Sequence, residues 1–158
     1  MAPLRTLLTS ALLLGSMAVS AHSYHGGDLD IAHPWSRPLP PVATIGVAYL
    51  QVTNNGAADD VLLGASTPVA DRVEIHTHQK EGELMKMRQL NELVIPAGGE
   101  QTLAPGGHHL MLMGLKKVPA EGERFPLTLH FKQAGDVEVE VAVDAEPAKA
   151  QGHGHGQH

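Results

Sequence analysis

Val137-Glu138-Val139-Glu140-Val141 is the stretch of sequence that decides the fold of this chain. Its valines and glutamates alternate strictly, as they do in a β-strand with one face in an apolar core and the other in water. The helical spacing of three to four residues is hard to find anywhere after the first 21 residues. The alternation therefore indicates an all-β chain.

Short apolar or alternating segments recur along the chain before this stretch. Turn residues separate them, for example Asn54-Asn55-Gly56 and Pro105-Gly106-Gly107. Strands with turn signals about every 8–12 residues are typical of an antiparallel sandwich or barrel. The expected strands are residues 28–32, 44–53, 60–65, 72–78, 84–89, 92–95, 108–113, 125–132 and 137–143.

The composition excludes several classes of protein. A length of 158 residues allows one domain, and a hydrophobic content of 42% is enough for its core. The chain has 11 His and 6 Met but no Cys, which excludes disulfides, thiolate zinc sites, cysteine nucleophiles and blue-copper sites that need a thiolate. Its formal charge of −6 is the wrong sign for a nucleic-acid-binding protein.

Both ends of the chain differ in composition from the middle. Residues 1–21 have one positive charge, an apolar run and small residues at Val19 and Ala21, as in a secretory signal peptide. We expect cleavage near Ala21, export to the periplasm and no further membrane span. The folded domain is then 22–146, and residues 147–158 form a low-complexity, histidine-rich tail that we expect to be disordered.

Strand alternation determines which histidine and methionine side chains can meet. Three of the expected strands present such residues from one face: His76 with His78, Met85 with Met87, and His109 with Met111 and Met113. Thioether sulfur is a soft ligand and imidazole a borderline one, a combination that suits Cu(I). The alternative is that each methionine fills the core and each histidine is an ordinary surface residue.

The spacing of four of these residues is specific. His76, Met87, His109 and Met111 are separated by ten, twenty-one and one residues. With the blocks 32–37, 48–54, 84–88, 105–115 and 126–131, this spacing resembles the periplasmic copper chaperones called PCu(A)C. The resemblance covers residues 28–144.

The resemblance implies a cupredoxin-like or Ig-like antiparallel β-sandwich with one exposed Cu(I) site. It implies that His76, Met87, His109 and Met111 are the ligands, and that the protein delivers copper to the copper centres of respiratory oxidases. The neighbouring His78, His108, Met85 and Met113 lie outside that set, and whether His78 or His108 joins a copper site stays open.

Histidines at both ends suggest further copper binding. His153, His155 and His158 of the tail can bind Cu(II) through imidazole, and the alternative is a solvated tail with incidental metal affinity. If cleavage follows Ala21, His22 offers an amine and an imidazole that could bind Cu(II), with His25 nearby in a segment expected to be flexible. The alternative, which we favour for this end, is an ordinary surface amine.

These features together favour a monomeric copper chaperone that is not an enzyme. Its acceptor would be a cytochrome oxidase subunit or another copper chaperone. The chain has no GxSxG, HExxH or Gly-rich phosphate-loop motif. Two alternatives stay open: a copper storage or buffering protein without a dedicated acceptor, and a copper oxidoreductase that uses the His22 terminus.

Overall fold

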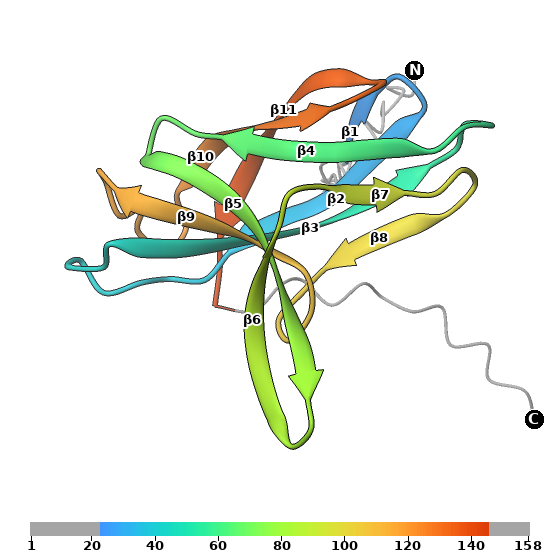
Figure 1. Cartoon of the computed structure of the whole chain (residues 1–158). Coiled ribbons are helices and arrows are strands. Elements are labelled where there is room, and N and C mark those ends of the chain that lie inside the picture. Colours follow the sequence, from blue (N-terminus) through green and yellow to red (C-terminus); the bar gives the residue numbers. More distant parts are fainter. Residues whose placement is uncertain (1–22, 146–158) are drawn as a thin grey trace, which may run out of the picture.

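A computed structural model describes residues 23–145, which form eleven β-strands and no helix (Figure 1). Within this part of the chain there is accordingly no helix that could cross a membrane. The strands are β1 Ser23–Gly26, β2 Leu29–Ser36, β3 Ile45–Asn54, β4 Asp60–Ser66, β5 Ala70–Glu81, β6 Leu84–Leu90, β7 Leu93–Ile95, β8 Glu100–Leu103, β9 His109–Leu115, β10 Arg124–Phe131 and β11 Gly135–Val143.

Seven of the strands close into a ring. The order is β2-β11-β10-β4-β5-β9-β3, and β3 pairs again with β2. All neighbours are antiparallel except β11 and β2, which share a short parallel pairing. The other four strands extend from this ring, with β1 on β2, β6 on β5, β7 on β4 and β8 on β3. The predicted all-β antiparallel fold is thus confirmed, with its sheet closed on itself.

The alternation that predicted the fold is the alternation that builds the core. Along β11, Val137, Val139 and Val141 are buried, while the glutamates between them face outward. Leu127 and Leu129 of the neighbouring β10 are fully buried and belong to the same core cluster. Each such side chain contributes about 1.5–3 kcal/mol on burial. The inside of the ring is therefore apolar, and side chains that could bind a ligand are expected on its outer face.

All nine expected strands are present, with ends that differ by a few residues, but two strands were missed. The segment expected to be flexible instead forms β1, whose Tyr24 pairs with Ile31 of β2. The strand β8 pairs with β3 through Leu103 and Leu50. Both missed strands are short and mostly polar, so neither has the alternation by which a strand is recognised in a sequence.

The β5–β6 hairpin projects from the barrel (Figure 1). The first part of β5, through His76, pairs with β9 in the ring, whereas residues beyond it pair with β6. Glu81 pairs with Leu84, so the turn consists of Gly82 and Glu83. Gly82 has φ of +65°, as the first residue of a type II′ turn requires. The hairpin therefore carries Met87 out of the barrel wall, whereas His76 lies where β5 leaves the ring.

Candidate metal centre

The strand β5 lies between β6 and β9, and its register with both brings the predicted ligands to one face. His76 is the register partner of His109 on β9. Met87 of β6 is the partner of His78, two residues further along β5. Met111 of β9 is the partner of Glu74, two residues before His76. Register partners in antiparallel strands project from the same face, so all four predicted ligands lie on one face of the three strands.

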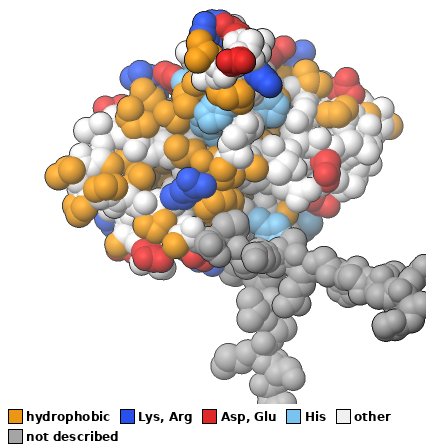
Figure 2. Space-filling model, turned by 90° about the horizontal axis from the view of Figure 1, so that it is seen from below, with side chains coloured by type: hydrophobic (Ala, Val, Ile, Leu, Met, Phe, Trp, Pro, Cys, Tyr) orange, Lys and Arg blue, Asp and Glu red, His pale blue; other side chains and the backbone are white. Residues whose placement is uncertain are grey.

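That face is the outer face of the barrel. Ile75 and Leu110, which alternate with the predicted ligands along β5 and β9, are buried in the core. A space-filling view from below shows histidine and hydrophobic side chains gathered at the foot of the projecting hairpin (Figure 2). The candidate site thus lies where the hairpin leaves the barrel, with the apolar core directly behind it.

His109 is the most enclosed of the predicted ligands, with 3% of its surface exposed. Its ring centroid is 5.8 Å from that of His76 and 5.2 Å from that of His78. Burial is the main cause that lowers the pKa of His109, and His78, His76 and His108 act in the same direction, while the hydrogen bond to Gly107 opposes them. His109 is therefore held in the neutral form that a metal requires.

A backbone contact also fixes the orientation of the His109 ring. Its Nδ1 lies 3.0 Å from the carbonyl oxygen of Gly107. Because a carbonyl only accepts hydrogen bonds, Nδ1 must carry the proton and donate it. The lone pair of the neutral ring is then on Nε2, which is the nitrogen left to bind a metal.

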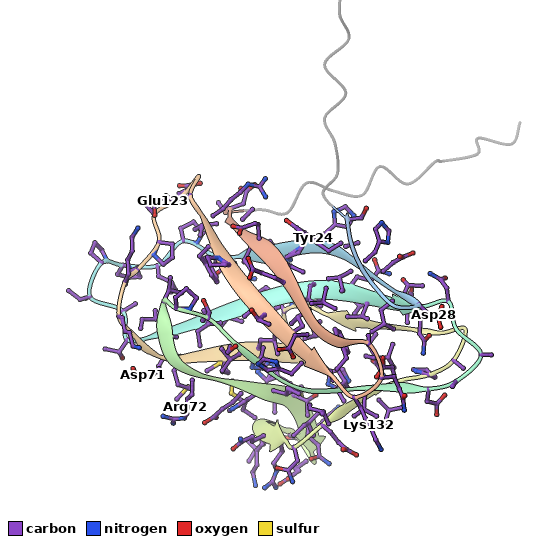
Figure 3. The ribbon with its side chains drawn as sticks, turned by 90° about the horizontal axis from the view of Figure 1, so that it is seen from above. Tyr24, Asp28, Asp71, Arg72, Glu123 and Lys132 are labelled. Atoms are coloured by element: carbon purple, nitrogen blue, oxygen red, sulfur yellow. The ribbon has the colours of Figure 1, made fainter. Side chains whose placement is uncertain are left out.

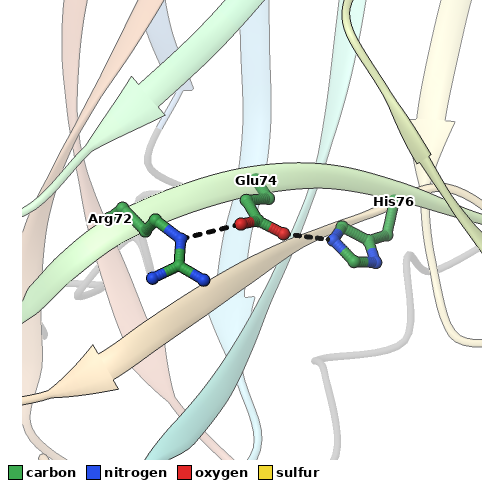
Figure 4. Close-up of polar contacts among 3 residues, drawn as sticks. All are labelled: Arg72, Glu74 and His76. Carbon is green, nitrogen blue, oxygen red and sulfur yellow. Dashed lines mark hydrogen bonds and ion pairs between the residues drawn. The ribbon is translucent and has the colours of Figure 1, made fainter.

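His76 is held by a carboxylate on its own strand. Its Nε2 lies 2.8 Å from Oε2 of Glu74, whose Oε1 accepts a hydrogen bond of 2.8 Å from Nε of Arg72 (Figure 4). The hydrogen bonds from Arg72 and then from His76 lower the pKa of Glu74, so this carboxyl group is ionised at neutral pH. The other nitrogen of His76, Nδ1, is buried and has no hydrogen-bond partner among the described residues.

The two methionines lie on opposite sides of His76. Met87 is on the hairpin and is 46% exposed, whereas Met111 is on the barrel wall and half-buried. Each lies diagonally across from His76, because their direct partners are His78 and Glu74. Whether both sulfurs can bind one ion therefore depends on the twist of the hairpin and on the length and flexibility of the methionine side chains.

Two histidines outside the predicted ligand set belong to the same cluster. His78 is nearer to His109, ring to ring, than His76 is. His108 directly precedes β9, and its Nδ1 is buried without a hydrogen-bond partner in the described part of the chain. Strand alternation places His78 on the same face as His76, so the position of His78 could be predicted from the sequence. No sequence pattern predicted the position of His108.

Thioether sulfur is the other ligand type that this cluster presents. Among residues 23–145, no three His, Asp or Glu side chains are grouped so that they could hold a metal ion by themselves. The chain also contains no cysteine. Met87 and Met111 are on the same face as His76 and His109, and methionine sulfur as a ligand would select a soft ion.

Several predicted features lie elsewhere or outside the described residues. The signal peptide at 1–21, His22, and the tail histidines His153, His155 and His158 are outside the described residues. His25 lies on β1, where its Nδ1 contacts the carboxylate of Asp30.

A shallow cavity of about 210 Å³ is separate from the histidine cluster. Asp28 and Asp60 are among the residues that line it. Seen from above, Asp28 lies at the opposite end of the barrel from Arg72 of β5 (Figure 3). The buried carboxylate of Asp60 already accepts hydrogen bonds from the backbone amides of Gln133 and Ala134. The burial of this carboxylate is therefore accounted for by the backbone that it holds.

Comparison with known proteins covers the whole barrel. The family model described as "Putative lipoprotein LpqE-like" matches residues 29–143, from the start of β2 to the end of β11. The protein named "Putative lipoprotein Lxx21020" of Leifsonia xyli subsp. xyli is 29% identical over 137 residues, which are 81% of each chain.

Solved structures show the same fold. The copper-bound PCuAC domain from PmoF2 is 29% identical with a TM-score of 0.70, covering 79% of this chain and 99% of that domain. The apo PCuAC domain from PmoF1 is 30% identical with a TM-score of 0.68, covering 79% and 100%. The solution structure of CuI-DR1885 from Deinococcus radiodurans is 28% identical with a TM-score of 0.61, covering 83% and 86%.

Proposed function

Because the chain belongs to the LpqE-like family, and similar solved structures are PCu(A)C domains, we propose that it is a copper chaperone with a Cu(I) site made by His76, Met87, His109 and Met111. One of those structures is described as copper-bound and another as the Cu(I) form. The solved relatives are named as copper-bound or Cu(I) forms, which supports a protein that binds copper and is not an enzyme.

The observation that carries this proposal is the shared face of β6, β5 and β9. Three separate strands contribute two imidazoles and two thioethers to it. A shift of one residue between β5 and β6 would turn Met87 away, and the same shift between β5 and β9 would turn away both His109 and Met111. Two neutral nitrogens and two neutral sulfurs suit Cu(I), which is soft and carries a single charge. Thioethers have no proton to lose, so this part of the binding is independent of pH.

The exposure of the ligands supports a site that gives its copper away. Met87 on the hairpin is 46% exposed, whereas His109 on the barrel wall is 3% exposed. A ligand of an acceptor protein can displace the exposed thioether first, while the buried imidazole of His109 and the partly buried imidazole of His76 still hold the ion. The ion would then pass to the acceptor by stepwise exchange of neutral ligands, without a free intermediate.

The other parts of the proposal concern where the protein works and with what. We infer export through residues 1–21 to the periplasm, in keeping with the lipoprotein names of the family and of its relative. The acceptor is a copper centre of a respiratory oxidase or another copper chaperone, and the protein acts as a monomer. His153, His155 and His158 hold a second copper as Cu(II).

X-ray absorption at the copper edge of the Cu(I)-loaded full chain tests the site. We expect two sulfur and two nitrogen neighbours per copper, and the same spectrum for a chain that lacks residues 147–158. A spectrum with nitrogen and oxygen neighbours alone would reject the methionine ligands.

Copper transfer tests the chaperone role. We expect the Cu(I)-loaded chain to metallate the soluble copper-binding domain of an oxidase subunit. Tight Cu(I) binding without transfer would instead favour storage or buffering, and turnover of an oxidisable substrate by the copper-loaded protein would favour the oxidoreductase.

A further inference from the structure

Arg72, Glu74 and His76 form a hydrogen-bonded row along the outer face of β5. They are alternate residues of one strand, so their side chains project from the same face. Nε of Arg72 donates to Glu74 at 2.8 Å, and Nε2 of His76 lies 2.8 Å from the second carboxylate oxygen (Figure 4). Both oxygens of Glu74 are thereby engaged, which restricts rotation of the carboxylate.

This row determines which nitrogen of His76 carries the proton. An ionised carboxylate only accepts hydrogen bonds, so the proton between Glu74 and His76 belongs to Nε2. The neutral ring then has its lone pair on Nδ1, on the far side of the ring from Glu74. That atom is buried and has no hydrogen-bond partner among the described residues, whereas a buried polar atom is normally paired.

The second imidazole has the opposite arrangement. His109 donates from Nδ1 to the carbonyl of Gly107, and its free nitrogen is Nε2. The centroids of the two rings are 5.8 Å apart. The Glu74 carboxylate fixes the tautomer of His76, the Gly107 carbonyl fixes that of His109, and the two tautomers are opposite. Partners of this kind set the ring orientation and the basicity of histidine ligands in metal sites.

We propose that Glu74, oriented by Arg72, is a positioning residue that makes His76 bind copper through Nδ1, while His109 binds it through Nε2. This inference rests on the proposed Cu(I) site and adds to it the binding atoms and the residue that selects one of them. Glu74 does not touch the ion; it acts through the imidazole of His76.

A second carboxylate on the same strand serves as the matched control. Glu81 is also on β5 and is also ion-paired, but with Lys86 and Arg88 of the hairpin and not with an imidazole. Replacement of Glu81 therefore removes a comparable surface carboxylate while leaving His76 untouched. An effect that follows Glu74 alone cannot come from a general loss of surface charge.

The first test is nitrogen NMR of the full chain labelled with ¹⁵N. In the metal-free protein we expect His76 to show a protonated Nε2 and a bare Nδ1, and His109 the reverse. On addition of Cu(I), the coordination shift should appear at Nδ1 of His76 and at Nε2 of His109. A coordination shift at Nε2 of His76 would overturn the proposal, because Glu74 would then have to leave the ring.

The second test compares Glu74→Ala with Glu81→Ala. We expect Glu74→Ala to mix the His76 tautomers and to weaken Cu(I) binding about 10- to 100-fold with unchanged stoichiometry. Glu81→Ala should leave both unchanged, and Glu74→Gln, whose amide oxygen can still accept from Nε2, should retain the tautomer. Equal affinities of Glu74→Ala and Glu81→Ala would overturn the proposal. Absence of Cu(I) binding in the wild type would instead reject the proposed function, and the metal-free spectra would still report on Glu74.

Discussion

His76 and His109 are direct register partners across the β5–β9 ladder, with ring centroids 5.8 Å apart. Their meeting depends on the pairing of two strands that are distant in the sequence and that help to close the barrel. The buried Ile75 and Leu110 lie directly behind them on the inner face. The two imidazoles are therefore positioned by the fold itself, whereas Met87 is positioned by the projecting hairpin.

Met87→Leu and Met111→Leu should each abolish or strongly weaken Cu(I) binding while the barrel stays folded. Leucine keeps the apolar volume of methionine but has no sulfur, so the change removes a ligand with little effect on packing. We expect the free energy of unfolding of Met87→Leu to change by less than about 0.5 kcal/mol, since the side chain is 46% exposed. Competition with a chromophoric Cu(I) chelator gives the affinity, and thermal unfolding gives the stability.

Met85→Leu and Met113→Leu are the matched controls for that pair. Met85 pairs with Lys80 and Met113 with Arg72, so each lies one step further from His76 along the same face. Their affinities for Cu(I) should equal that of the wild type. Equal losses in all four variants would point to a general effect of methionine content and would remove the case for a specific site.

His109 should make the stability of the metal-free protein depend on pH. Its pKa is lowered by burial, so the unfolded chain binds more protons than the folded one at pH values below the ordinary histidine pKa of about 6.5. Stability is then full above that pH and falls as the pH drops from there toward the folded pKa. Denaturant unfolding of wild type and His109→Gln across this range should show a smaller loss in the variant, and parallel pH profiles would contradict the assignment to His109.

Strand positions could be predicted from the sequence wherever apolar and polar residues alternate, as in Val137–Val143. The two missed strands are short and mostly polar, and they form because an existing strand edge offers hydrogen bonds. The face on which His76, Met87 and His109 project could be predicted as well, because side-chain direction in a strand follows from position alone.

The partners of the site residues could not be predicted in the same way. Which strands are neighbours, and in which register, is a property of the whole sheet. The placement of His108 and the contact between His109 and the Gly107 carbonyl depend on the loop before β9. The hydrogen bond from His76 to Glu74 needs particular rotamers of both side chains, which a sequence does not specify.

Leu110→Ala should destabilise the barrel by about 2–5 kcal/mol, because it leaves a cavity in a close-packed core. Leu110 is fully buried, pairs with Ile75 and separates His109 from Met111 along β9. Leu84→Ala on the hairpin is the control, since Leu84 is 65% exposed and its loss should matter little. Denaturant midpoints give both values, and a Leu110 variant as stable as the Leu84 variant would be inconsistent with the described core.

Deletion of residues 147–158 should remove most of the capacity of the protein for Cu(II) and leave Cu(I) binding intact. The deleted segment contains His153, His155 and His158, whereas the four proposed Cu(I) ligands lie on β5, β6 and β9. Titration followed by electron paramagnetic resonance counts bound Cu(II), and chelator competition reports Cu(I). An unchanged Cu(II) stoichiometry in the shortened chain would show that the tail is not the second site.

Gly82→Val should weaken Cu(I) binding without unfolding the barrel. Gly82 has φ of +65°, a conformation that a β-branched residue adopts only with strain. Apart from Gly82 and its two chain neighbours, no described residue has an atom within 4 Å of the position that a Cβ would take there. The substitution therefore strains the backbone of the turn and does not cause a steric clash. The hairpin can relieve this strain by changing its twist or register, which displaces Met87.

Gly82→Asn separates this backbone effect from the loss of glycine itself. Asparagine tolerates positive φ far better than valine, so its affinity for Cu(I) should stay close to that of the wild type. Amide exchange should increase along Leu84–Leu90 of the valine variant and stay unchanged in β10 and β11. If Gly82→Val bound Cu(I) as tightly as Gly82→Asn, the placement of Met87 by this turn would be refuted, because the strain would not reach the ligand.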